Sequence, residues 1–434
     1  MPLAVAGHLN HGMDHGLYSA AMSSNVQYAT MWPFLPFDIT SLIIDIVGGS
    51  KDTVLLKELS LVSHSFHQIC SKHLFATVDL HDANCKCASS KKRFIKLVKS
   101  RPNVVNYIRK VTYKVSYVND INDDDHLLSP ILSNFLPTTS RLNSLAIIAF
   151  SRNWNLLDSS LTSAFLHLMR FPTVNHIDLS NIKNFPFSSL PQSVNLHRLD
   201  INTLTHFDQP EIVVESEMNQ MMPKIREFHT SDSYLSTTKL LHAKMHDGRP
   251  AFNFMDLRRL WIFLMVSEDE RNFRYLLQNA KLLEKLHLSV LHGQGLMGLH
   301  DILSPIARTL KVLSFSVSAD HPALAGLYEE LEAMTGHYMV EALSIEFIVD
   351  SELGDDTVDS VGCDFQKVEK VLVKPGWSAL RQVSFIVSSS FENITPKLTE
   401  VFQSLPDIYL SHLSKLESVS FNFSISVQPD SFLF

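Results

Sequence analysis

The sequence predicts an α/β protein in which three short helices precede an irregular solenoid, a curved parallel sheet covered by outer helices. Two observations support this fold class. Residues 35–80 contain three short segments whose apolar residues recur at helical spacing. From residue 107 onward, an apolar pattern typical of short half-buried strands recurs, with helical segments between its copies.

The composition restricts the class of protein. The chain has 434 residues, of which 45% are hydrophobic, enough for two or more domains or one elongated solenoid. The formal net charge of -8 gives no overall attraction to nucleic acid or to an anionic membrane. Four cysteines do not make a disulfide framework, and neither a signal peptide nor a membrane-spanning apolar run is visible. We therefore expect a cytoplasmic or nuclear protein that is not secreted.

Residues 1–34 are rich in Gly, His, Ser, Asn and Met and show no sustained period, so we predict a disordered leader. His8, His11, Asp14 and His15 are close enough in sequence to raise the question of a metal site. The glycines among them disfavour the helix that would align these side chains, and no second ligand cluster is in view. No metal site is predicted.

Residues 35–80 are predicted to form three helices and a closing strand over residues 76–80. Gly48-Gly49 should end the first helix, because glycine adopts the left-handed conformation at little cost. Asp38 and Ser63 are expected to cap the first and third helices, and Asp52 or Thr53 to start the second. The expected apolar stripes are Ile39, Leu42, Ile43 and Ile46, then Leu55, Leu56, Leu59 and Val62, then Phe66, Ile69 and Cys70.

The first predicted helix carries more apolar surface than one stripe. Leu35, Phe37, Ile43, Ile44 and Val47 spread around it, and three helices of this length cannot bury all of this surface among themselves. A helix that is apolar on more than one face needs a second partner. That partner is either another protein or the repeats that follow, and the sequence does not decide between these two possibilities.

Residues 81–106 form a basic linker that is expected to contain one helix, which Pro102 ends. Seven Lys or Arg residues lie between Lys86 and Arg101. We interpret them as the solvated face of an amphipathic helix, although a patch for an acidic partner or nucleic acid was the alternative. The predicted inner face consists of Phe94, Ile95, Leu97 and Val98.

One pattern, apolar-x-x-apolar-x-apolar, recurs through residues 107–434, where x stands for any residue. Its final alternation predicts a short strand with one buried face. The copies lie roughly 22 to 40 residues apart, a period that favours a leucine-rich-repeat architecture of stacked strand–helix units. The copies are Ile108–Tyr113, Leu142–Ile147, Val174–Leu179, Leu196–Ile201, Leu257–Ile262, Leu283–Leu288, Leu310–Phe315, Val340–Ile345, Leu380–Phe385 and Leu416–Phe421, with a degenerate copy at Ile225–Phe228.

The variable residues of each predicted strand should line the concave face, the usual binding surface of a solenoid. They are mostly neutral or aromatic, so we expect a protein target and no nucleic acid. Long insertions near residues 206–222, 350–379 and 390–415 should make the horseshoe irregular. The predicted target-binding residues are Asp178, Asp200, Trp261 and His287, and further expected concave residues are Arg109, Thr112, Ser314, Ser344, Ser384 and Ser420.

The N-terminal helices resemble an F-box. Leu35-Pro36 is similar to its start, and Leu59-Ser-Leu-Val-Ser-His-Ser-Phe66 to its third-helix signature of Val-Ser-Arg followed by an aromatic residue. Lys72-His-Leu-Phe-Ala-Thr-Val-Asp-Leu80 resembles the segment that follows the F-box in fungal members. Two departures are His64, where the family usually has Arg, and Phe66, where animal members often have Trp.

This resemblance implies a function and a set of residues. The helices would bind a Skp-type adaptor and through it the cullin of an SCF-type E3 ubiquitin ligase, while the array holds a target protein. The family's pattern falls on positions that build the module or meet the adaptor, and those residues are Leu35, Pro36, Ile39, Leu42, Ile43, Leu59, Val62 and Phe66.

The sequence contains no motif that requires catalysis or a cofactor. It has no Gly-x-Ser-x-Gly elbow, no His-Glu-x-x-His helix, no Cys-x-x-Cys pair and no Gly-rich phosphate loop. We therefore expect a substrate receptor that is not an enzyme. The alternatives are a leucine-rich-repeat scaffold whose helices only cap the array and bind no adaptor, and a hydrolase on an α/β sheet, which would differ in strand order.

Overall fold

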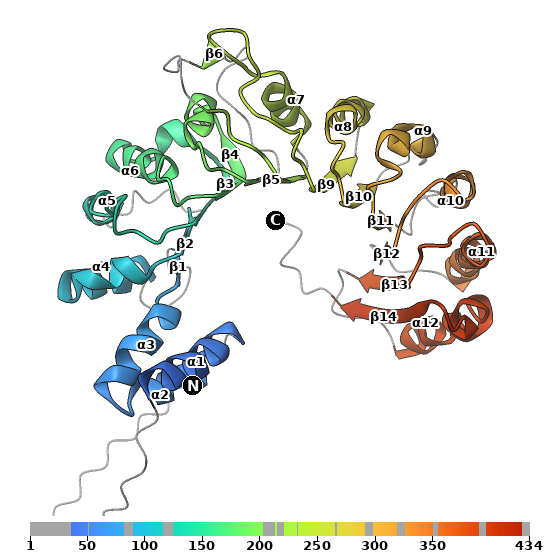
Figure 1. Cartoon of the computed structure of the whole chain (residues 1–434), viewed down its shortest axis with the longest axis horizontal. Coiled ribbons are helices and arrows are strands. Elements are labelled where there is room, and N and C mark those ends of the chain that lie inside the picture. The colour runs from blue at the N-terminus through green and yellow to red at the C-terminus, as the bar shows by residue number, and fades with distance from the viewer. Residues whose placement is uncertain are drawn as a thin grey trace, which may run out of the picture.

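The computed structural model describes residues 36–50, 52–81, 90–115, 125–202, 213–214, 221–231, 233–264, 267–290, 298–318, 326–349, 355–389 and 396–427. Within these ranges, three helices stand at one end of a long curved sheet whose strands line the inner side of an arc (Figure 1). The predictions for the leader over residues 1–34, for Leu35 and for most of the insertion near residues 206–222 fall outside the described residues.

The three N-terminal helices are α1 (Phe37–Gly49), α2 (Thr53–Ser60) and α3 (His64–Leu74). Two predicted starts are confirmed: the Asp52 carboxylate accepts bonds from two N–H groups of α2, and the Ser63 hydroxyl accepts one from α3. The predicted cap of α1 is wrong, because Pro36 occupies the N-cap position and Asp38 lies inside the first turn. A carboxylate there still interacts favourably with the helix dipole.

The first helix ends at Gly49 as predicted, but the reason differs from the one expected. Neither Gly48 nor Gly49 is among the described glycines that have a positive φ. A methyl group at Gly48 would instead overlap the His73 imidazole of α3, whereas one at Gly49 would meet nothing within 4 Å. Gly48 therefore serves the close approach of two helices.

The helices have a small core of their own, separate from the core of the sheet. The third predicted stripe is confirmed, since Ile69 and Cys70 are buried and Phe66 packs beside them. The stripe predicted for α1 is wrong. Helix α1 turns Thr40 and Ile44 inward and leaves the predicted residues Ile39, Leu42, Ile43 and Ile46 exposed.

Twelve parallel strands form one sheet in chain order, and the short strands β6 and β8 pair separately. Strands that meet only their neighbours in the chain are the arrangement of a solenoid. A doubly wound α/β sheet reverses its strand order, so the sheet expected of a hydrolase is ruled out. The strands are β1 (Thr77–His81), β2 (Lys110–Lys114), β3 (Ser144–Asn153), β4 (His176–Lys183), β5 (Arg198–Asn202), β6 (Val213–Val214), β7 (Glu227–Thr230), β8 (Lys244–Met245), β9 (Arg259–Leu264), β10 (Lys285–Val290), β11 (Val312–Ser318), β12 (Ala342–Val349), β13 (Gln382–Ser389) and β14 (Ser420–Val427).

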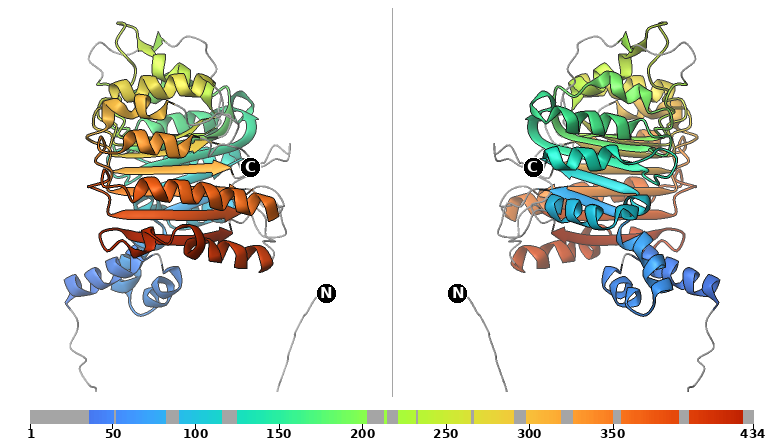
Figure 2. Two further views of the ribbon diagram at one scale, coloured as in Figure 1. Left: turned by 90° about the vertical axis from the view of Figure 1, so that its right-hand side faces the viewer. Right: turned by 90° about the vertical axis from the view of Figure 1, so that its left-hand side faces the viewer.

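The helices between the strands lie on the convex side of the arc, and the sheet forms the concave side (Figures 1 and 2). None of the helices in the described ranges combines the length and apolarity needed to cross a membrane. The outer helices are α4 (Ser90–Ser100), α5 (Asp125–Ser133), α6 (Ser159–Met169), α7 (Tyr234–His242), α8 (Ser267–Asn279), α9 (Leu299–Leu303), α10 (Leu327–Met334), α11 (Asp355–Leu372) and α12 (Pro396–Tyr409), with 3-10 turns η1 (Pro102–Tyr107), η2 (Trp154–Leu156), η3 (Phe187–Gln192), η4 (Ser304–Ile306) and η6 (Leu413–Lys415).

Two segments predicted as insertions are regular parts of the solenoid. Residues 350–379 contain α11 and residues 390–415 contain α12. Each helix packs on the sheet through buried apolar residues, such as Phe365 in α11 and Phe402 in α12. In α11 the buried residues Phe365, Val368 and Leu372 recur at helical spacing, so the helical period is present in the sequence, although the segment was predicted as an insertion.

The sheet begins earlier than the repeat pattern predicts. Strand β1 belongs to the segment assigned to the three-helix module, yet it pairs with β2 as the first strand of the sheet. Helix α4 packs Phe94, Ile95 and Val98 into the same core, as predicted for its inner face, and is the first outer helix. Lys91 departs from the predicted solvated face, because it is buried with its Nζ 3.2 Å from the Tyr113 hydroxyl.

The register of the last strand corrects one predicted copy. Ser384 of β13 lies opposite Asn422 of β14, and Ser420 lies two residues before that position. The alternation of apolar residues continues from Val419 to Phe423, so the pattern fits two registers equally well. Asn422 therefore takes the place predicted for Ser420.

Candidate functional site

An apolar surface on the N-terminal helices is the first candidate site. Nine large apolar side chains on α1, on α2 and in the turn after α2 are between 38% and 86% exposed. Soluble proteins rarely expose apolar side chains so close together, and such surfaces usually mark interaction sites. We call this surface the helical face, and it comprises Phe37, Ile39, Leu42, Ile43, Ile46, Val54, Leu55, Leu61 and Val62.

The residues that the sequence predicts for adaptor binding divide into two groups. Leu59 and Phe66 are half-buried and pack on the core of the helices, so they build the module. The other described residues are exposed at the surface, and they are Pro36, Ile39, Leu42, Ile43 and Val62. Leu35 lies outside the described residues.

Polar contacts hold α1 against α3 beside this face. The Asp45 Oδ1 atom lies 2.7 Å from both the Lys72 Nζ and the His73 Nε2. The hydrogen bond from Lys72, together with that from His73, outweighs the desolvation of the carboxylate and lowers the pKa of Asp45. The charged Asp45 carboxylate therefore ties α1, which carries part of the helical face, to α3.

The concave face is the second candidate site. Strand register places Asp178 beside Asp200 and Trp261 beside His287, and His229 of β7 stands between the two pairs. The four predicted target-binding residues thus share one row with His229. We call these five residues the central row. His229 was not predicted, because the degenerate copy of the pattern ends at Phe228. In the complete copies, the residue that follows the second apolar residue faces the concave side, and His229 has this position.

The other predicted concave residues have different outcomes. Thr112 continues the central row toward β1 but is buried. Ser314, Ser344 and Ser384 continue it toward β14 and are half-buried. Arg109 is exposed before the start of β2, so its place in the row was wrongly predicted.

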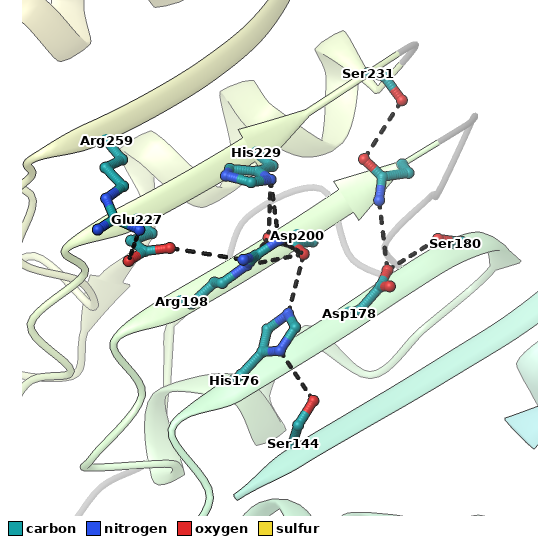
Figure 3. A network of polar contacts seen from close by, with 11 residues as sticks. Ser144, His176, Asp178, Ser180, Arg198, Asp200, Glu227, His229, Ser231 and Arg259 are labelled. Atoms are coloured by element: carbon teal, nitrogen blue, oxygen red, sulfur yellow. Dashed lines mark hydrogen bonds and ion pairs between the residues drawn. The ribbon is translucent and has the colours of Figure 1, made fainter. Parts of the chain in front are cut away.

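Asp200 is the centre of a polar network on this face (Figure 3). It is only 5% exposed, and Arg198 donates to both of its carboxylate oxygens at 2.9 to 3.2 Å. His176 Nε2 lies 3.0 Å from Oδ2. Burial favours the neutral acid, but the bonds from His176 and Arg198 outweigh it and lower the pKa of Asp200. Asp200 therefore positions Arg198 instead of reaching a partner itself.

The network continues across β7 to β9. Glu227 lies between two guanidinium groups, with its carboxylate oxygens 3.7 Å from Arg198 and 3.0 Å from Arg259 (Figure 3). Arg198 also lies 3.3 Å from the His229 Nδ1. The two arginines are thus fixed in place at the start of the strands, with part of each side chain exposed.

Asp178 occupies the least favourable position for a charge in the network. Burial and the neighbouring Asp200 carboxylate raise the pKa of Asp178. The Ser180 hydroxyl donates to its Oδ1 at 2.9 Å, and the Asn202 amide approaches the same atom at 3.4 Å. These bonds only partly compensate the cost of burying a charged carboxylate at this position.

Trp261 is the large apolar group of the central row. It is 45% exposed, and its ring centroid lies 3.9 Å from that of His287 and 5.7 Å from that of His229. Burial lowers the pKa of His287 to about 4 and also lowers that of His229. Two neutral imidazoles therefore flank an exposed indole, an arrangement suited to apolar contact at the centre of a polar surface.

The sheet beyond Trp261 is lined by hydroxyl groups. Ser316 and Ser388 donate to the two carboxylate oxygens of Glu346 at 2.7 and 2.6 Å. The Ser316 hydroxyl also lies 3.1 Å from the His287 Nε2. This half of the concave face is consequently more neutral than the half around Asp200.

Ser144, His176 and Asp200 are linked in the order of a Ser-His-Asp relay, with 2.9 Å between the Ser144 hydroxyl and the His176 Nδ1. Ser144 is only 7% exposed, and its N–H bonds to the Arg109 carbonyl instead of facing a reacting group. The three residues therefore serve to link β3, β4 and β5. Among the described residues, no cluster of His, Cys, Asp or Glu has the composition to hold a metal ion.

Comparison with models of known protein families finds no match to the chain, and a search of curated proteins finds no similar sequence. The two surfaces described above are therefore the basis for assigning a function.

Proposed function

We propose that this protein is an F-box substrate receptor of a cullin-type (SCF) E3 ubiquitin ligase. Its helical face binds a Skp-type adaptor, and its leucine-rich-repeat-like array binds a target protein. The exposure of the helical face is the observation that carries the proposal. Helices α1 to α3 have their own core, and the apolar side chains that remain on their surface favour a partner outside the chain.

The structure also bears on the alternative in which the helices only cap the array. A cap would bury its apolar surface against the first strand, yet Ile39, Leu42 and Ile43 remain 45% to 60% exposed. The surplus apolar surface expected from the sequence is thus free for a partner. This supports docking over a scaffold with no ligase role.

In the proposed function this chain contributes no catalytic group. It holds a target near a transfer enzyme in another subunit, and the rate gain comes from proximity. The curved sheet suits this role because it presents an extended surface on regular, mutually supporting strands. The proposal implies a cytoplasmic or nuclear site of action.

Co-purification with a recombinant Skp-type adaptor tests the proposal. We expect Leu42→Asp combined with Val62→Asp to abolish adaptor binding, because both side chains are exposed on the helical face and a charge there opposes burial in an interface. The control is Leu156→Asp, an even more exposed leucine in η2 that should leave binding unchanged. Adaptor binding that survives the double substitution contradicts the proposal, and a natural chain that binds no adaptor supports the scaffold alternative.

A further inference from the structure

The edge of the sheet where the strands begin carries a continuous row of side chains. From β2 to β13, the residue just before each strand of the long curved sheet donates its N–H to the carbonyl of the corresponding residue in the preceding repeat. Arg258 bonds in this way to Arg226 at 2.8 Å, Glu284 to Arg258 at 2.9 Å, and Lys311 to Glu284 at 2.8 Å. Successive side chains at this edge are therefore neighbours, about 5 Å apart.

The edge is positively charged, although the chain as a whole has a net charge of -8. From β5 to β11, six Lys or Arg side chains stand beside two carboxylates at the last position before each strand and the first position within it. All but one of these cations are exposed, and Arg198 is half-buried. We call this set the basic edge, and it comprises Arg198, Arg226, Glu227, Arg258, Arg259, Glu284, Lys285 and Lys311.

The carboxylates of the basic edge are already engaged. Glu227 pairs with Arg259 and more distantly with Arg198, and Glu284 lies 2.8 Å from Arg258. Arg198 is also paired with Asp200, and Lys311 lies 3.9 Å from Glu341, so the excess of positive charge at the edge falls mainly on Arg226 and Lys285. The ion pairs hold the other arginine side chains in fixed positions. An anionic partner therefore meets a preorganised surface.

Exposed apolar side chains accompany these cations. Trp261 follows Arg259 by two residues on the concave face and is 45% exposed. Met255 and Leu282, in the loops that lead into β9 and β10, are 65% and 44% exposed. Cationic and apolar side chains are thus both exposed on β9 and β10 and in the loops that lead into these strands.

We propose that the basic edge and Trp261 bind an acidic polypeptide segment that carries apolar or aromatic side chains. This inference rests on the proposed function, because it names the chemistry of the target. Carboxylates of the segment pair with the exposed cations, and its apolar side chains cover Trp261, Met255 and Leu282. In an extended segment every third residue recurs after about 10 Å, which matches every second strand of the sheet.

The same features argue against a nucleic acid at this edge. A phosphate backbone carries an unbroken series of negative charges. Glu227 and Glu284 would lie against that series at two points of the edge. An acidic peptide avoids this repulsion, because it places neutral or apolar residues opposite the carboxylates.

Fluorescence anisotropy with the full chain tests the inference. The probe is a fluorescein-labelled fifteen-residue peptide that repeats Glu-Glu-Phe, compared with peptides that repeat Lys-Lys-Phe or Glu-Glu-Ser and with an oligothymidylate of the same length. We expect the Glu-Glu-Phe peptide to bind most tightly, and its affinity to fall as salt rises from about 50 to 300 mM. Tighter binding of the oligothymidylate, equal binding of Lys-Lys-Phe, or no binding of Glu-Glu-Phe overturns the inference.

Variants locate the site. Arg226→Glu combined with Lys285→Glu, and separately Trp261→Ala, should each weaken Glu-Glu-Phe binding about ten-fold or more. The control Lys96→Glu combined with Lys99→Glu makes the same charge change on exposed residues of α4 and should leave binding unchanged. Equal losses in the edge variant and the α4 control contradict the assignment to this edge. Adaptor binding measured on the same variants should be retained, which separates failure of this inference from failure of the proposed function.

Discussion

The His73 imidazole of α3 and the Asp45 carboxylate of α1 lie 2.7 Å apart, and Gly48 leaves the space that the imidazole ring occupies. The position of α1 on α3 thus depends on Gly48, because any larger residue at this position would overlap the His73 ring. The exposed helical face is carried largely by α1, so this contact also orients the surface proposed to bind the adaptor.

Gly48→Ala should loosen the three-helix module. The added methyl group would overlap the His73 ring, and overpacking of this kind costs about 1–3 kcal/mol. Hydrogen exchange of α1 and α3 measures the effect as faster exchange that is confined to these helices. Gly49→Ala is the matched control, because a methyl group there meets nothing within 4 Å. Equal protection in the two variants would contradict the proposed role of Gly48.

Arg198→Met should destabilise the array, because it leaves the buried Asp200 carboxylate without its guanidinium partner. We expect a loss of about 1–3 kcal/mol in the free energy of unfolding by urea. Adding Asp200→Asn should recover part of this loss, since it removes the buried charge that has lost its arginine partner. The comparison is Arg249→Met, whose partner Asp247 is exposed to solvent, and which should change the free energy of unfolding very little. A loss no larger than that of the comparison would show that Asp200 does not depend on Arg198.

Asp178→Asn should stabilise the protein at pH 7. Burial and the Asp200 charge raise the pKa of Asp178, so the contribution of this group to stability is complete only below its ordinary pKa of 3.8 and is lost as pH rises through the folded pKa. The gain from the substitution should therefore shrink as the pH falls from 7 toward 4. Urea midpoints at both values measure it, with Asp79→Asn, an exposed residue in the same row on β1, as the control. A gain that grows at low pH would contradict this account.

The pKa of His287, lowered to about 4, makes stability fall with acidification. The unfolded chain binds a proton near pH 6.5, whereas the folded chain takes it up only near pH 4, so stability is full above 6.5 and is lost between these values. We expect a loss of about 1–3 kcal/mol over this interval. His287→Gln should remove this part of the pH dependence, and His246→Gln, an exposed histidine, should preserve it. Unfolding curves at half-unit steps check the slope.

Local patterns in the sequence predicted most of the array. The apolar residues of every copy but the last are buried between the sheet and the helices, because their alternation places them all on one face of the strand. Those of the last copy are half-buried. The central row follows from the same alternation, and Trp261 and His287, both expected on the concave face, lie side by side on β9 and β10. The pattern fails at β14, where alternating residues fit two registers, and at His229, where one apolar position is missing from the copy.

The sequence alone determined the parallel stacking, the start of the second helix at Asp52 or Thr53, the cap at Ser63 and the concave position of Trp261, because these depend on near neighbours in the chain. It left open whether the apolar residues of α1 meet the repeats or a partner. The tertiary structure decided that Ile44 faces the core and Leu42 faces solvent, since packing against α3 selects one of two apolar faces of the same helix. The network around Asp200 and the basic edge likewise exist only after folding, because their charges come from strands that lie far apart in the chain.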